Sequence, residues 1–161
     1  MKMKKKKIIL IGLAVIMILA AFSCKSKDDG VPQETFPENI DIDLITKVGD
    51  TFTEILKALN DKDYEKYVSY YNIPQADKNL IIEGIKNASE QYTSYYTVYN
   101  VWAMENEDGT INATILIDNK STSKINNATS VIRDTMYYIL SESNGKFYIE
   151  SYENGMSEQI D

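Results

Sequence analysis

Hydrophobic residues recur every three or four positions through the first half of the chain's central region, a spacing that predicts amphipathic helices. The first helix is expected from Leu44 to Leu59, and residues 60–63 interrupt its pattern. Asp63 is a suitable N-cap for a second, shorter helix. A third helix is expected after the turn at Ile73-Pro74. The apolar stripes of the three helices are Leu44, Val48, Phe52, Ile55 and Leu59; Tyr64, Tyr67, Val68 and Tyr71; and Leu80, Ile81, Ile85, Ala88 and Tyr92.

After Gln91 the period changes to two and the residues become rich in Tyr, Thr, Val and Ile, which is typical of strands. Asp108-Gly109 and Asn144-Gly145 are tight-turn signals, and residues 119–127 are predicted to form a polar loop. Three helices followed by an antiparallel meander predict an α+β domain whose curved sheet packs on the helices. The four strands are expected at 92–104, 111–118, 129–142 and 147–152.

The N-terminus has the pattern of a secretory signal peptide. Four lysines, Lys4 to Lys7, precede an uncharged apolar run over residues 8–22, which ends at Ser23-Cys24. This run is shorter than the 18 or more residues expected of a spanning helix. Ser23-Cys24 at the end of the run resembles the lipobox of bacterial lipoproteins, although Ala21 and Phe22 depart from its preferred residues. The resemblance implies removal of residues 1–23 and attachment of diacylglycerol to Cys24; the alternative is an uncleaved anchor with an incidental cysteine.

Loss of residues 1–23 would remove five of the 17 basic residues and none of the 24 acidic ones, leaving a formal charge of about −12. An acidic surface argues against nucleic acid as a partner and against attraction to anionic lipid heads, so membrane attachment would depend on the acyl chains. Residues 24–39 are polar and contain Gly30, Pro32 and Pro37, which predicts a flexible lipidated tether. The folded domain is expected over residues 40–153, with a frayed tail at 154–161.

The order of elements and the corner Leu59-Asn60-Asp61-Lys62-Asp63-Tyr64 resemble the nuclear transport factor 2-like family, over roughly residues 44–152. This resemblance implies a cystatin-like α+β cone with a pocket between the sheet and the long helix. The family contains both enzymes and binding domains, so the fold does not determine the function.

The residue inventory restricts catalysis. The chain has no histidine, one cysteine and one arginine, Arg133, which excludes Ser-His-Asp and Cys-His pairs and any histidine-containing metal site. We expect no cofactor and no metal. Isomerases of the resembled family use a pocket Asp to move a proton and a Tyr hydroxyl to donate to the oxyanion. Asp134 is the candidate for that base, because it shares a strand face with apolar residues. The alternative is that Asp134 lies at a strand end or pairs with a cation across the sheet. Tyr92, Tyr96 and Trp102 are candidate donors and ligand contacts.

The opposite face of the same strand holds Arg133 with Val131, Thr135, Tyr137 and Ile139, and is largely apolar. For Arg133 we favour a salt bridge over contact with a ligand anion. In the resembled family a partner subunit often covers this face, which makes a homodimer through the sheet a reasonable hypothesis. The twelve tyrosines suit contacts with ligands or proteins as well as core filling, and Tyr137 is the candidate contact on this face.

The leading hypothesis is a membrane-anchored lipoprotein of the bacterial cell envelope, outside the cytoplasm, whose domain binds a small apolar molecule in the cone or an envelope protein on the sheet. One alternative is a cofactor-free isomerase or lyase that uses a pocket carboxylate, and another is a purely structural or assembly lipoprotein. We favour a protein that is not an enzyme. An enzyme requires a deep pocket that contains Asp134 or another desolvated acid, whereas an interaction module predicts a filled cone and an exposed sheet face that includes Tyr137 and Ile139.

Overall fold

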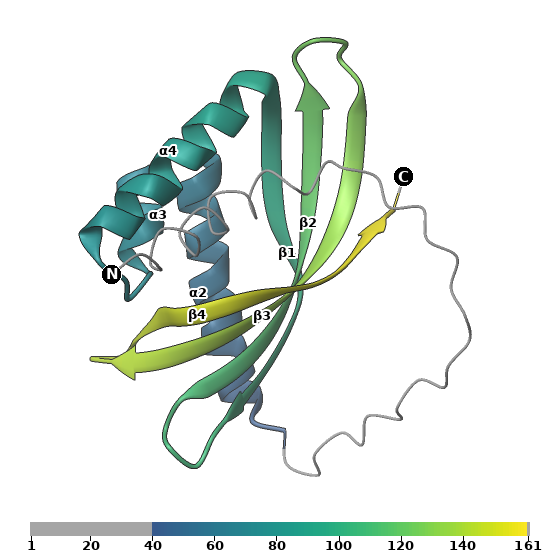
Figure 1. Cartoon of the computed structure of the whole chain (residues 1–161). Helices are drawn as coiled ribbons and strands as arrows, with labels where there is room; N and C mark the ends of the chain where they lie inside the picture. The colour runs from purple at the N-terminus through teal and green to yellow at the C-terminus, as the bar shows by residue number, and fades with distance from the viewer. Residues whose placement is uncertain (1–39, 161) are drawn as a thin grey trace, which may run out of the picture.

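Three helices precede a four-stranded antiparallel sheet in the computed structural model, which describes residues 40–160 (Figure 1). The predicted signal peptide, Cys24 and the predicted tether lie outside the described residues. Within residues 40–160, no helix has the length and apolar character needed to cross a bilayer. The elements are α2 (Ile42–Asn60), α3 (Tyr64–Ser69), α4 (Gln75–Gln91), β1 (Tyr92–Glu105), β2 (Ile111–Ser123), β3 (Thr129–Ser143) and β4 (Lys146–Gln159).

Short polar side chains start the first two helices. Asp41 Oδ1 accepts a hydrogen bond from Leu44 N at 2.9 Å, and Asp63 Oδ1 accepts one from Lys66 N at 3.1 Å. The predicted N-cap role of Asp63 is therefore confirmed. Between α2 and α3 the chain reverses at Lys62, whose φ of 62° lies in the left-handed region. This corner directs α3 back across the end of α2.

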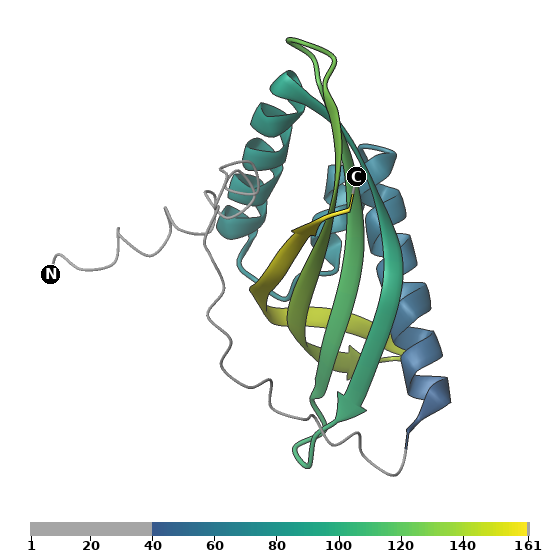
Figure 2. The ribbon, with the colours of Figure 1, turned by 90° about the vertical axis from the view of Figure 1, so that its right-hand side faces the viewer.

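The strands follow one another in the order β1-β2-β3-β4, and all neighbours are antiparallel, as the sequence predicts. The sheet twists strongly, and the three helices lie on one of its faces, while Figure 2 looks onto the other face. The core lies between α2 and the sheet. Its largest fully buried side chains are Phe52, Ile115, Leu140, Ile149, Val48 and Val68.

Strand β2 extends further than expected, so the predicted loop at 119–127 is wrong for its first half. Residues 119–123 pair with the first residues of β1, from Tyr96↔Asn119 to Tyr92↔Ser123. Asn119 and Ser121 are buried in this segment, and their side chains are hydrogen-bonded there. The Ser121 hydroxyl donates to Asn119 Oδ1 at 2.8 Å and lies 2.8 Å from the Ser94 hydroxyl. Polar residues can occupy a core-facing strand position when their hydrogen bonds are satisfied there.

Strand β4 also extends further, so the predicted frayed tail is wrong for residues 154–159. These residues pair with β3, from Met136↔Asn154 to Ile132↔Gln159, and Ile160 N donates to Val131 O at 3.0 Å. Their side chains are exposed and have low strand propensity, so the sequence gives no periodic signal for this segment. The ladder to the long strand β3 holds it in place.

Candidate functional site

A cavity of about 220 Å³ lies between the sheet and the three helices. A cavity of this size has room for a small molecule. Lys62 and Asn154 are exposed residues in its wall, so the cavity reaches the surface. The most frequent side chain in the wall is tyrosine, at positions 64, 67, 71, 92, 96, 138 and 152.

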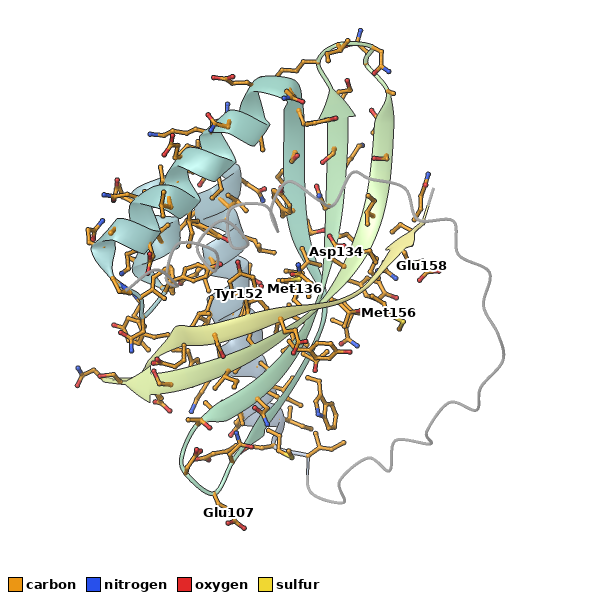
Figure 3. The ribbon with its side chains drawn as sticks, viewed as in Figure 1. Glu107, Asp134, Met136, Tyr152, Met156 and Glu158 are labelled. Atoms are coloured by element: carbon orange, nitrogen blue, oxygen red, sulfur yellow. The ribbon has the colours of Figure 1, made fainter. Side chains whose placement is uncertain are left out.

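Asp134 is the one acidic residue among those that line the cavity. It is 7% exposed, and its Oδ1 accepts a hydrogen bond from Ser157 Oγ at 2.5 Å across the β3–β4 pair. Burial raises the pKa of the Asp134 carboxyl, and the bond from Ser157 offsets only part of that rise. Figure 3 shows Asp134, Met136 and Tyr152 on the helix side of the sheet, with Met156 and Glu158 on the other side.

Buried tyrosines form the apolar part of the wall. Burial raises the pKa of Tyr67 to about 12, and raises the pKa values of Tyr71 and Tyr138 well above that of a free phenol. These phenols are therefore neutral at physiological pH and able to donate or accept hydrogen bonds. The hydroxyls of Tyr67 and Tyr71 are 2.8 Å apart, and the rings of Tyr138 and Tyr152 have centroids 6.1 Å apart.

Polar clamps fix the helices to the strands at the α4–β1 end of the cavity. Asn60 at the end of α2 donates from Nδ2 to Tyr96 O at 2.8 Å and accepts from Tyr96 N at 2.9 Å. Lys124, in the β2–β3 loop, donates from Nζ to Ser89 O on α4 at 2.6 Å. These bonds connect segments that are far apart in the sequence, so they keep the helices and the sheet edge together at this end.

No protein-family model matches the sequence, and no curated protein matches it. Solved structures do match. Aln2 from a Streptomyces species is similar with 13% identity and a TM-score of 0.58, over 71% of this chain and 91% of that chain. ActVI-ORFA from Streptomyces coelicolor is similar with 12% identity and a TM-score of 0.59, over 73% and 96%. A ketosteroid isomerase-like protein from Erwinia carotovora atroseptica is similar with 14% identity and a TM-score of 0.54, over 74% and 98%.

The domain has a nuclear transport factor 2-like fold. At these identities the likeness establishes the fold alone. It agrees with the α+β cone that the corner at residues 59–64 and the element order imply.

The cone brings together three of the sequence-predicted site residues, Tyr92, Tyr96 and Asp134, which all line the cavity. Trp102 is not among the lining residues. Strand β1 has a bulge between Val98 and Asn100, after which Val101 and Ala103 face the core instead of the even-numbered residues. One extra residue moves every following side chain to the other face, so Trp102 is directed away from the cavity.

Other residues in the wall were missed as ligand contacts. Tyr67 and Tyr71 belong to the predicted α3 stripe, and Tyr138 belongs to the predicted face of Asp134, but their periodicity is equally typical of core packing. Tyr152 lies next to another bulge. Tyr138 pairs with Tyr152 and Leu140 pairs with Ile149, so β4 has one more residue than β3 between these two pairs. Sequence periodicity alone does not locate such a bulge.

The opposite face of the sheet has a different character. Arg133 forms a bidentate salt bridge to Asp118, with Nε 2.7 Å from Oδ1 and Nη2 2.9 Å from Oδ2, which confirms the predicted salt bridge. The Arg133 guanidinium also lies 3.2 Å from the centroid of the Tyr99 ring. Tyr137 and Ile139 are 46% and 42% exposed on this face. Both an open cone and an exposed apolar face are therefore present, and the homodimer through this face stays a prediction.

The chemistry available in the cone is that of one carboxylate, several neutral phenols, two lysines and the amides and hydroxyls of Asn and Ser side chains. Among residues 40–160 no group of His, Cys, Asp and Glu side chains is arranged to hold a metal ion. The Asp134 carboxylate can accept hydrogen bonds or a proton, and tyrosine hydroxyls in the same wall can donate. The site is suited to bind a small molecule with an apolar body and one polar or charged group.

Proposed function

We propose that this protein is a membrane-anchored lipoprotein of the bacterial cell envelope whose cone binds one small, largely apolar molecule. The observation that carries the proposal is the cavity of about 220 Å³ lined by seven tyrosines and one buried carboxylate. Well-formed apolar clefts of this kind are few on any one protein. An apolar wall with a few polar groups is the usual composition of a ligand site.

The buried carboxylate supports ligand binding because it costs stability. A carboxylate removed from water without a cation destabilises the folded protein, and an apolar residue at this position in β3 would not carry that cost. Buried ionisable groups of this kind cluster at functional sites. Asp134 supplies the cone with its one acidic contact.

The anchoring half of the proposal depends on the sequence of residues 1–39. Cys24 follows a basic segment and an apolar run of fifteen residues, in the arrangement typical of a lipoprotein leader. An acylated Cys24 would tether the cone to the membrane through residues 25–39. Two acyl chains give stable anchoring, whereas one chain gives only marginal binding.

Binding of indole tests the proposal for the cone. Indole is small, aromatic and neutral, and it carries one N–H donor that can meet the Asp134 carboxylate. Ala88 on α4 lines the cavity, so Ala88→Phe should fill the space and abolish the saturation-transfer NMR signal of indole. Asn87→Phe places the same ring on the exposed neighbouring position and should leave the signal intact. Absence of indole binding to the unmodified chain, or equal binding to both variants, would overturn the proposal.

A second candidate is a cofactor-free isomerase that uses Asp134 as its base. Burial of this carboxyl raises its pKa and makes it a better proton acceptor, and Tyr96 and Tyr138 lie in the same wall as possible donors to an oxyanion. In such a reaction Asp134 would take a proton from the carbon next to a carbonyl and return it two carbons further along. The test is the isomerisation of 3-cyclohexenone to 2-cyclohexenone. Catalysis by the unmodified chain that is lost in Asp134→Asn would support this function. A reaction rate no higher than the uncatalysed background would exclude the function for this substrate class.

A further inference from the structure

The cavity has one acid, Asp134, and two lysines, Lys62 and Lys124, in its wall. Asp134 is buried in its wall, and among residues 40–160 no lysine or arginine forms an ion pair with it. The hydrogen bond described for this carboxylate comes from Ser157 and reaches one oxygen, Oδ1. A buried carboxylate is ordinarily paired with a cation or a metal ion.

The basic residues around the cavity do not supply that partner. Lys124 Nζ is held by the Ser89 carbonyl at 2.6 Å, and Lys62 lies exposed on the corner between α2 and α3. Arg133, the neighbour of Asp134 in β3, points to the opposite face and is paired with Asp118. Among residues 40–160 the Asp134 carboxylate therefore has no ion-pair partner, and it lies in a wall rich in aromatic rings.

Tyrosine rings attract cations over their faces, and two such cation–π contacts are present outside the cavity. Lys146 Nζ lies 4.4 Å from the centroid of the Tyr70 ring, and the Arg133 guanidinium lies 3.2 Å from that of Tyr99. Seven tyrosines line the cavity, which contains no tryptophan or phenylalanine in its wall. Phenol rings combined with one carboxylate form the kind of surface that holds alkylated ammonium groups.

We infer that the cone takes a small organic cation, an alkylated ammonium compound, with its charge next to Asp134 and its alkyl groups against the tyrosine rings. This inference rests on the proposed function and adds the charge of the ligand to it. The cavity volume of about 220 Å³ admits a compact ammonium compound. The acidic composition of the chain, with a net charge of −7, favours the approach of a cation.

Choline and its neutral isostere 3,3-dimethylbutan-1-ol provide the test, because the two molecules have the same shape and differ in the charge of one atom. The full chain is placed in nanodiscs of phosphatidylglycerol, which contain no choline, and empty nanodiscs give the background. Binding is followed by saturation-transfer NMR of the methyl protons. Choline should bind at least about tenfold more tightly than the alcohol, as expected for a contact to a charged group.

Two pairs of variants locate the contact. Asp134→Asn should weaken choline binding roughly tenfold and leave the alcohol unchanged, whereas Glu142→Gln, which removes an exposed charge from the same strand, should change neither. Tyr152→Phe keeps a ring in the wall and should retain choline, while Tyr152→Leu should weaken it. Equal affinity for choline and the alcohol, or no effect of Asp134→Asn on choline binding, would overturn the inference. If the protein still binds indole in that case, the proposed function stands. If the protein does not bind indole either, both the inference and the proposed function are wrong.

Discussion

At the scale of single residues, Asp134 is the buried acidic group on which the proposed ligand site depends. Its carboxyl is raised in pKa by burial, so the folded state binds a proton more readily than the unfolded state does. The penalty for burying the charged form is absent at a pH below the unfolded pKa, about 3.9, and is complete above the folded pKa. Stability should therefore fall as the pH rises between these two values.

Asp134→Asn removes this titration and keeps an oxygen that can accept from Ser157. We expect the variant to be more stable than the parent at pH 7, by about 0.5–2 kcal/mol, and the difference to shrink as the pH approaches 4. Thermal unfolding followed by circular dichroism at both pH values measures the change, with Glu142→Gln as the control. A loss of stability at pH 7 would mean that the ionised carboxylate is stabilised in the fold.

The residues of the site were only partly predictable. Alternation along β3 placed Asp134 and Arg133 on opposite faces, and it was sufficient to favour a salt bridge for Arg133. Alternation along β1 failed at Trp102, because a bulge between Val98 and Asn100 exchanges the two faces. Bulges depend on local pairing between strands, which a single-strand pattern does not encode.

At the scale of elements, the second half of β4 shows how a strand forms without a hydrophobic pattern. Residues 154–159 are exposed and polar, yet they extend the sheet to Gln159 because β3 offers an unpaired edge. Gly155 lies at the irregular pairing between Asp134 and Met136. A Cβ atom there would lie 2.7 Å from Tyr137 Cε2 and 2.9 Å from the Thr135 carbonyl oxygen.

Gly155→Ala tests this packing. The Tyr137 ring can move, but the Thr135 carbonyl is backbone, so we expect the variant to lose about 1–3 kcal/mol of stability. Gly84→Ala, in the middle of α4, serves as the matched control and should be neutral or slightly stabilising because alanine is the better helix former. Denaturant unfolding measures both. Equal stability of Gly155→Ala and the parent would show that β4 does not approach β3 this closely.

At the scale of the whole molecule, the fold class was predictable and the contents of the cone were not. The helical periodicity, the Asp63 cap and two Gly-containing turns were sufficient to predict three helices and a four-stranded meander. Whether the tyrosines fill the interior or surround a cavity depends on how far the helices lie from the sheet. That distance is set by many contacts at once, including the Asn60 clamp on Tyr96, and no local pattern reports it.

Cellular location belongs to the same scale. Cells that express the chain and receive a radioactive fatty acid should incorporate label into it, and Cys24→Ala should remove that label because the chain has no other cysteine. The variant should also keep its leader and migrate as the longer precursor. Equal label in both proteins would refute lipidation at Cys24 while leaving the cavity and its ligand untouched.

The central claim is that the cone is an open cavity that holds one small molecule beside Asp134. A crystal structure of the protein soaked with indole tests it most directly. The account predicts one indole molecule between the sheet and the helices, with its N–H within hydrogen-bond distance of the Asp134 carboxylate and tyrosine rings around it. A cone filled by the protein's own side chains, with no indole in it, would contradict the account.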